Sequence, residues 1–352
     1  MKEEKSATRK RQSESVTLRE VAERAGVHPM TVSRALKGSL SVAEETRLNI
    51  QRIAKELNYI PNAAAQALVR GRSETIAVVT GPVSEHYCAQ LLHFLEIELT
   101  ANAYKMLMLG SRDLNHDLLS LVNTKAVDGV IAVDASPHID EWIRAGNLFV
   151  PPCVYAGISN PDWVVSLAID SIHTDLSEAV GHAVEMMLNT GSRRIAYIVA
   201  NQGMSRPNEV RAHAYEQTLK RAGYRPEIIN LGIGDDTSAH DLTRQKMIQY
   251  VRAHGCADGF LCQNDEMAMA TYRALRDMGL RIPEDVQLVG CDGLSYTECF
   301  DPQISTIVQP AEQMCALAWQ FLQRRINDDS IARQQAHLQA HLRVRGSLRG
   351  AL

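Results

Sequence analysis

The sequence of 352 residues lacks the features that mark membrane and secreted proteins. Its most apolar runs, such as residues 76–79 and 130–133, have the length of a strand, whereas a helix needs about 20 apolar residues to cross a bilayer. Residues 1–15 are charged and contain no apolar stretch of the kind found in a signal peptide. We therefore expect a cytoplasmic protein without a membrane partner.

The sequence also lacks the usual signs of a metal centre or an active site. The seven cysteines are scattered and form no C-x-x-C pair, so we expect buried or free thiols. A zinc site would need a tighter cluster of Cys and His than the sequence contains. No G-x-x-x-x-G-K-[ST], G-x-G-x-x-G or G-x-S-x-G motif occurs, and no cluster of Asp, Glu and His has catalytic spacing. These absences predict no metal, no cofactor and no enzymatic activity.

Charge is unevenly divided along the chain. Residues 1–72 carry 14 Lys and Arg against 8 Asp and Glu, a net charge of +6, although the whole chain has a net charge of −4. The remaining residues therefore carry a net charge of −10. A basic N-terminal part on an acidic remainder indicates that only the N-terminal part meets a polyanion such as DNA.

The N-terminal part shows the start and stop signals of three helices. Thr17 and Glu20 have the spacing of a capping box, and Gly26 ends the first helix in a tight turn. Pro29 begins the second helix, at a position where its missing amide is harmless. The stretch 41–44 has the pattern of another capping box and opens the third helix.

Two short helices joined at a glycine and supported by a third predict a helix-turn-helix. In the second helix Val32, Ala35 and Leu36 face inward, while the polar residues between them face outward. Arg34 on that outer face has the geometry to donate two hydrogen bonds to a guanine edge. The helix pattern alone is also compatible with any other three-helix module that has an exposed polar face.

The stretch from Val16 to Gly71 resembles the DNA-binding head of the LacI/GalR family of bacterial transcription regulators. The resemblance rests on V-T-L-R-E-V-A-E-R-A-G-V-H-P-M-T-V-S-R-A-L-K and T-R-L-N-I-Q-R-I-A-K-E-L-N-Y-I-P-N. It departs from the family pattern at position 28, where His28 replaces a small capping residue such as Ser. The resemblance implies DNA contacts from Thr17, Leu18, His28, Pro29, Met30, Thr31, Ser33, Arg34 and Lys37.

Residues 61–73 follow as a hinge and linker. Asn62 is a good helix cap and the alanines after it favour helix, but so short a segment is unstable alone in water. The resemblance implies a hinge helix that folds in the DNA minor groove through Asn62, Ala65, Gln66 and Leu68. Leu68 matches the leucine that inserts between base pairs and kinks the duplex. A plain alanine-rich linker is the other interpretation.

From residue 74 the pattern alternates strands with amphipathic helices, which predicts parallel sheets covered by helices. The strands are too many for one such sheet, so we expect two doubly wound lobes with a ligand between them, at the carboxyl ends of the strands. The predicted strands are 76–80, 105–109, 129–134, 153–156, 195–200, 228–231, 259–263 and 287–291.

Later stretches, among them Q-N-D-E-M-A-M-A and G-L-R-I-P-E-D-V-Q-L-V-G-C-D-G, extend the resemblance to about residue 348. They imply an α/β periplasmic-binding-protein-like (type I) effector domain behind the all-α helix-turn-helix head. The predicted organisation is a charged, disordered tail (1–15), a helix-turn-helix domain (16–60), a hinge (61–73) and an effector and dimerisation domain (74–348). Its first lobe covers about 74–156 and 307–332, and its second lobe about 157–306 and 333–348.

Four positions carry over as effector contacts, namely Arg211, Asn264, Asp292 and Tyr87. An arginine and a carboxylate can grip adjacent hydroxyls of a sugar from both sides. Each residue also has a purely structural interpretation: a loop cap for Asp292, a helix cap for Asn264, and simple packing for Tyr87. Arg211 has a surface ion pair with Glu209 or Glu216 as its alternative.

The ligand expected from the resemblance is a neutral sugar, with a sugar acid as the alternative. Aromatic residues are only 5% of the chain, so a purine has few rings to stack on. The family often has an aromatic and a second polar residue around the late aspartate, where this chain has Cys291 and Gly293. These departures indicate a roomier pocket.

Together these features predict a repressor that binds a palindromic operator in double-stranded DNA and responds to a small-molecule effector. No leucine heptads follow the last family match, so we expect a homodimer and not a tetramer. The protein would then lie at the nucleoid. Two other classes stay open, namely a solute-binding protein for uptake and an enzyme of sugar or nucleotide metabolism.

Overall fold

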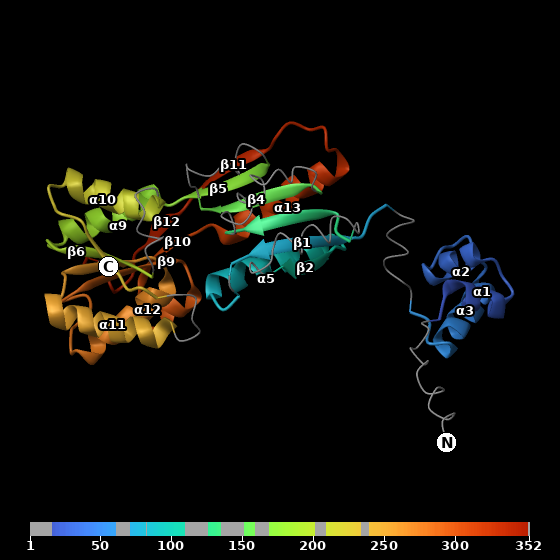
Figure 1. Cartoon of the computed structure of the whole chain (residues 1–352), viewed down its shortest axis with the longest axis horizontal. Coiled ribbons are helices and arrows are strands. Elements are labelled where there is room, and N and C mark those ends of the chain that lie inside the picture. The colour runs from blue at the N-terminus through green and yellow to red at the C-terminus, as the bar shows by residue number, and fades with distance from the viewer. Residues whose placement is uncertain are drawn as a thin grey trace, which may run out of the picture. The chain divides into compact units, whose positions relative to one another are not determined.

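The computed structural model describes residues 16–60, 71–81, 83–109, 126–134, 151–158, 169–200, 209–233 and 239–350. The chain divides into two compact units at Ser73 and Glu74, and each is described by itself (Figure 1). We call the described residues 16–60 the head and residues 74–350 the body. The predicted tail (1–15) lies outside the described residues. No helix of the described residues combines the length and the apolarity that a membrane span requires.

The head contains three helices, α1 (Leu18–Ala25), α2 (Pro29–Leu36) and α3 (Glu44–Glu56). The capping box of α1 is confirmed, because Thr17 accepts from the Glu20 amide and Glu20 accepts in return from the Thr17 amide. Gly26 ends α1 at a φ of +67°, a backbone conformation that glycine adopts without strain. Eight apolar residues from the three helices and the turn before α3 are buried together as its core.

The predicted second capping box is wrong. Helix α3 begins two residues later than a Ser41 cap requires, and its N-cap is Ala43, whose methyl group cannot accept a hydrogen bond. Ser41 pairs instead with Ser39, at 2.9 Å between the two hydroxyl oxygens. Glu44 and Glu45 in the first turn stabilise the positive end of the helix without a capping side chain.

The body contains two six-stranded sheets. The first has the order β11–β5–β4–β3–β1–β2, and its neighbouring strands are all parallel. Its strands are β1 (Thr75–Thr80), β2 (Lys105–Leu109), β3 (Gly129–Val133), β4 (Cys153–Ile158), β5 (Asp170–Asp175) and β11 (Gln335–Gln339).

The second sheet has the order β12–β10–β9–β8–β6–β7, and of its neighbouring strands only β10 and β12, at one edge, are antiparallel. Its strands are β6 (Ile195–Val199), β7 (Glu227–Asn230), β8 (Gly259–Cys262), β9 (Gln287–Asp292), β10 (Ser305–Val308) and β12 (His341–Arg343). All eight predicted strands are present, with ends within two residues of the prediction.

Helices cover the sheets as the alternating pattern predicted. One face of the first sheet packs on α5 (His86–Ala101) and α13 (Ala311–Asn327). The second sheet is covered on both faces, by α9 (Ser177–Asn189) and α10 (Val210–Arg221) on one and by α11 (Ala239–His254) and α12 (Asp265–Asp277) on the other. In the first sheet, alternate residues of β4 point to opposite faces and belong to two different cores.

The predicted lobe boundaries near 157, 306 and 332 are wrong by up to one strand. The chain leaves the first sheet only after β5, so Leu176 is the first residue in the second lobe's core. It returns after β10, at Gln309 and Pro310, and crosses for the last time at Ala340 between β11 and β12. The boundary was misplaced because β5 is polar in sequence, although Asp170, Ser171 and Thr174 within it are buried.

Candidate functional site

The outward surface of α2 carries exposed cationic side chains. Val32 and Ala35 are fully buried against the other two helices, which fixes the rotation of α2. Met30 is consequently 54% exposed, and Arg34 and Lys37 are exposed on the same helix and at its C-cap. The helix therefore presents a cationic surface one turn long, of the size that enters a DNA major groove.

The other predicted head positions support this surface. His28 is exposed and caps α2, because its Nδ1 accepts from the Met30 amide at 3.2 Å. The imidazole therefore caps the helix in place of the small residue that is usual at this position. Leu18 packs beside the core, while Thr17 is exposed as the cap of α1. Of the predicted contacts on α2, Pro29, Thr31 and Ser33 are half-buried.

The charges of the head differ between its helices. On α1 and α3, Arg19 pairs with Glu23 at 3.2 Å and Arg52 with Glu56 at 2.6 Å. Within residues 16–60, no acidic side chain forms an ion pair with Arg34. Its guanidinium is therefore available to bind an external anion. The predicted hinge contacts Asn62, Ala65, Gln66 and Leu68 lie outside the described residues.

The predicted ligand site centres on Asp292. It ends β9 with a φ of +133°, and its buried carboxylate accepts from Nε2 of Gln309 at 3.0 Å. Burial and the nearby Asp265 raise the pKa of Asp292, against the opposing effects of Arg211 and of the Gln309 hydrogen bond. The structure therefore does not use Asp292 as a simple loop cap.

Arg211 is also buried, in the first turn of α10. Its Nε donates to Glu209 at 2.7 Å, and its Nη1 donates to the Gln263 carbonyl at 2.7 Å. Burial disfavours the charge, but the Glu209 carboxylate more than offsets this and holds the pKa of Arg211 above its usual range. The alternative of a pair with Glu209 is therefore correct as to the partner, but the pair is buried and not on the surface.

Tyr87 joins this group from the first lobe. Its hydroxyl donates to Oε1 of Gln309 at 3.1 Å, and the same Gln309 side chain donates to Asp292. Gln309 occupies the second crossing of the chain, so one amide connects the two lobes. Gln309 was not among the predicted contacts. The glutamine follows a strand end, which was the available signal.

Asn264 is the N-cap of α12, and its side-chain oxygen accepts from the Met267 amide at 2.9 Å. The capping alternative is thus present, yet it occupies only the oxygen. Within the described part of the chain, no hydrogen bond involves the Asn264 amide nitrogen, Nη2 of Arg211 or Oδ2 of Asp292. Two donors and one acceptor of the predicted contacts therefore have no hydrogen-bond partner among the described residues.

Asp265, the neighbour of Asn264, is a second buried acid that sequence analysis missed. Its carboxylate accepts from Thr306 at 2.6 Å and from the Leu294 amide at 2.7 Å. Burial raises its pKa to about 6 in spite of these hydrogen bonds. A side chain at Gly290 would collide with this carboxylate, so the glycine keeps β9 close to α12. Asp265 fixes the framework around the site.

Two family models match the chain. The model "Bacterial regulatory proteins, lacI family" matches residues 17–62, and the model "Periplasmic binding protein-like domain" matches residues 184–348. Among curated proteins, the HTH-type transcriptional repressor CytR of Escherichia coli is 26% identical over 97% of this chain and 98% of its own length. Catabolite control protein A of Staphylococcus epidermidis is 26% identical over 95% of this chain and 99% of its own.

Solved structures share the fold. The lac repressor dimer bound to operator and the anti-inducer ONPF superposes with a TM-score of 0.77, at 23% identity, over 95% of this chain and 99% of that one. The complex of the transcriptional regulator CelR with cellobiose gives a TM-score of 0.63 at 26% identity, over 94% of this chain and 99% of that one.

Proposed function

The chain belongs to the lacI family of bacterial regulatory proteins, and on that premise we propose that it is a dimeric repressor whose affinity for an operator is set by a small ligand. The observation that carries the proposal is the outer surface of α2, where Arg34 and Lys37 are exposed next to Met30. A cationic helix on a packed three-helix scaffold is suited to the major groove. The similarity to the repressor CytR and to the lac repressor dimer on its operator supports the same proposal.

The ligand that we propose is a sugar or a sugar derivative. The atoms left for it, an arginine nitrogen, an amide nitrogen and a carboxylate oxygen, suit vicinal hydroxyls. The related CelR complex holds cellobiose. Ligand binding at Arg211, Asn264 and Asp292 would favour one arrangement of the lobes and so change the separation of the two hinges in a dimer.

The dimer finds support at the edge of the first sheet. Strand β2 is an edge strand, and Met108 on it is 48% exposed, while Ile97 on the neighbouring α5 is 52% exposed. Apolar side chains beside an unpaired edge strand favour an interface with another chain. A two-fold dimer would place two heads on the half-sites of a palindrome. We expect this dimer to act in the cytoplasm, at the nucleoid.

Selection of bound fragments from genomic DNA, followed by fluorescence anisotropy at fixed salt, tests the proposal. We expect a palindromic sequence bound at least about 10³-fold more tightly than random DNA. Equal affinity for all sequences would contradict it. A thermal-shift screen of sugars and sugar acids then identifies the ligand, because a ligand that binds the native state raises its stability. We expect the recovered ligand to be chemically unchanged after incubation, whereas turnover would favour an enzyme.

For the hinge we propose that Leu68 inserts between base pairs, as the family resemblance implies. Leu68→Ala should then weaken operator binding much more than non-specific binding, because only the kinked specific complex uses the leucine. Anisotropy titrations with operator and random duplexes at one salt concentration measure both. Equal losses on the two duplexes would rule out this role.

A further inference from the structure

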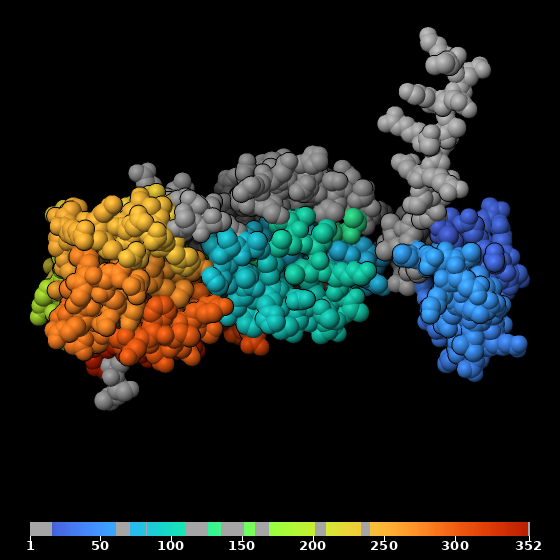
Figure 2. Space-filling model, turned by 90° about the horizontal axis from the view of Figure 1, so that it is seen from below, coloured from blue at the N-terminus to red at the C-terminus, as the bar shows by residue number. Residues whose placement is uncertain are grey.

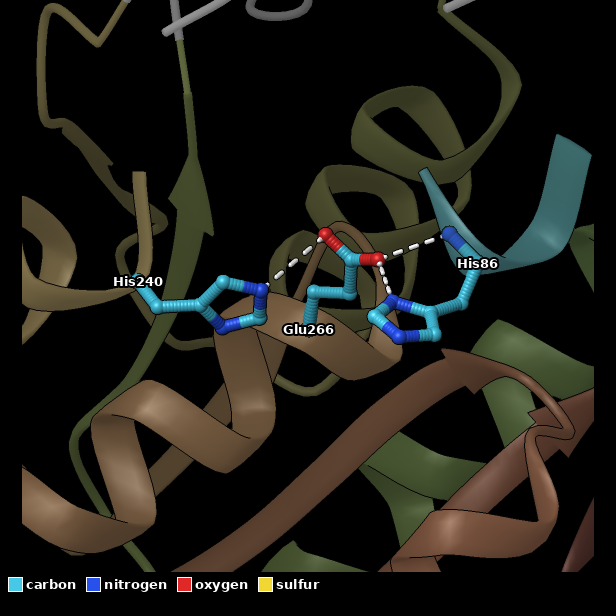
Figure 3. A group of neighbouring side chains, drawn as sticks. All are labelled: His86, His240 and Glu266. Atoms are coloured by element: carbon cyan, nitrogen blue, oxygen red, sulfur yellow. Dashed lines mark hydrogen bonds and ion pairs between the residues drawn. The ribbon is translucent and has the colours of Figure 1, made fainter. Parts of the chain in front are cut away.

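Three side chains that the proposed function does not use meet between the two lobes of the body (Figure 3). His86 is the first residue of α5 in the first lobe. His240 lies at the start of α11 and Glu266 in the first turn of α12, both in the second lobe. In the space-filling view the residues of α5 (cyan) adjoin the orange surface of the second lobe (Figure 2). The fold thus joins residues 180 positions apart.

The glutamate carboxylate lies between the two imidazole rings, with one oxygen toward each (Figure 3). Oε1 of Glu266 is 2.5 Å from Nδ1 of His86, and Oε2 is 3.5 Å from Nε2 of His240. The three ligand atoms all lie within 4.8 Å of one another. Ligand atoms around a tetrahedral zinc ion are about 3.4 Å apart, since each bond is about 2.0–2.2 Å long. Side-chain movements of about 1 Å would therefore admit the ion.

The surroundings prepare this group for a cation. The His86 amide donates to Oε1 of Glu266 at 2.8 Å, and the edge of the Tyr296 ring contacts the His86 ring, with 5.2 Å between centroids. The two imidazoles are 45% and 49% exposed, so an ion reaches them from solvent.

We propose that His86, His240 and Glu266 bind a divalent transition-metal ion of the zinc class and that this ion clamps the two lobes together. Two imidazoles and a carboxylate suit zinc, nickel or copper, and do not suit the hard ions calcium and magnesium, which prefer oxygen ligands. Within the described residues this is the one group of three such ligands. Sequence spacing predicted no metal because the three ligands come from three separate helices.

Because the ligands come from both lobes, the ion binds fully only when the lobes meet at this edge. A ligand with higher affinity for one arrangement shifts the population toward it. The ion is then a second effector, at a site separate from the one proposed for the sugar. Its influence on operator affinity rests on the proposed function, whereas the clamp itself does not.

Calorimetric titration of the full chain tests the clamp in the absence of DNA and sugar. The protein is stripped with EDTA, desalted and titrated with zinc chloride. We expect one ion per chain and an affinity at least about 10-fold weaker in His86→Ala and in His240→Ala, since mutation of even an outer-shell partner costs that much. Matched controls are His93→Ala on α5 and His254→Ala on α11, exposed histidines of the same helices, which should bind zinc like the unaltered chain.

The result in His86→Ala decides between a clamp and a site of the second lobe alone. Unchanged affinity in this variant, with loss in His240→Ala, would overturn the clamp. Affinity unchanged in both variants would overturn the site. A spectrum of the cobalt-loaded protein with thiolate charge-transfer absorption would also overturn it, because the ion would then lie on cysteines. Glu266→Gln keeps an acceptor for the His86 amide and provides a variant that stays folded if an alanine variant does not; it should also lose at least about 10-fold in affinity.

Hydrogen exchange adds a readout of lobe contact. Zinc should slow amide exchange at the start of α5 in the unaltered chain and leave it unchanged in His240→Ala, although that substitution lies in the other lobe. No slowing in the unaltered chain would overturn the clamp. An operator titration with and without zinc comes last. Zinc binding with clamped lobes but no change in operator affinity would leave the clamp intact and contradict only its coupling to the proposed function.

Discussion

The head and the body of this protein treat charge in opposite ways. The head holds Arg34 exposed on α2, with no acidic partner among residues 16–60. The body buries Arg211 and Asp292 and gives each a partner before any ligand arrives. An exposed cation costs little to maintain in water, whereas a buried charge is tolerated only when paired. A surface for a polyanion and a site for a small ligand therefore follow different rules.

The largest test of this comparison removes a buried charge of the body's framework. Asp170 in β5 accepts two hydrogen bonds from Arg325, at 3.0 and 2.8 Å, and one from the Gln334 amide at 2.7 Å. Asp170→Ala should lower the free energy of unfolding of the body by about 1–3 kcal/mol, because the half-buried Arg325 and the Gln334 amide lose their acceptor. Urea unfolding followed by tryptophan fluorescence measures it, since the buried Trp319 belongs to the first lobe's core.

The matched control is the ion pair of Arg281 with Asp285, which lies at the surface, at 2.6 Å. Asp285→Ala should leave the unfolding midpoint almost unchanged, because water screens an exposed pair. Equal destabilisation by the two substitutions would contradict the distinction between buried and exposed charge.

The next test sharpens the role of the buried carboxylate in the ligand site. Asp292→Asn preserves shape and the acceptor for Gln309 but removes the charge, so we expect 10- to 100-fold weaker ligand binding, equivalent to about 1.5–3 kcal/mol. Operator affinity without ligand should stay the same, since the head is untouched. Anisotropy titrations of the operator across ligand concentrations measure both. A full ligand response in this variant would remove Asp292 from the site.

The corresponding test of the head is Arg34→Ala. If Arg34 reads a base, the substitution should cost about 1–3 kcal/mol of operator binding and relax specificity at one position. Thermal stability should stay the same, because the side chain is exposed. The control Arg52→Ala, on α3 and paired with Glu56, should weaken operator and random DNA to the same small extent. If Arg34→Ala weakens the binding of operator and random DNA to the same extent, Arg34 contacts a phosphate and not a base.

The head could be predicted almost completely from sequence, because its determinants are local. The cap of α1, the stop at Gly26 and the start at Pro29 each depend on residues within one helical turn. The error at Ser41 shows the limit: the four-residue pattern of a capping box is present, but α3 begins later and the Ser41 hydroxyl pairs with Ser39. Local competition for a hydrogen bond is not visible in spacing.

The body was predictable only where burial coincides with hydrophobicity. The eight predicted strands were located within two residues, whereas β5, β10, β11 and β12 were not predicted. Strand β5 was missed because Asp170 and its neighbours are buried by pairing with α13 and the following loop. Gln309 and Glu266 escaped notice for the same reason. Each has a partner in a distant part of the chain, Tyr87 for Gln309 and His86 for Glu266, so no local pattern predicts the contact.

The smallest expected effect tests whether the head is governed by local hydrogen bonds. Thr17→Ala removes the oxygen that caps α1 and should lower the stability of the head by about 1 kcal/mol. Ser41→Ala should have almost no effect, because Ala43 and not Ser41 is the N-cap of α3. Thermal unfolding of residues 1–73 by circular dichroism compares the two variants, since these residues form a compact unit. If Ser41→Ala is the more damaging, the hydroxyl pair with Ser39 stabilises the head more than the α1 cap does, and the turn before α3 becomes the main determinant of its stability.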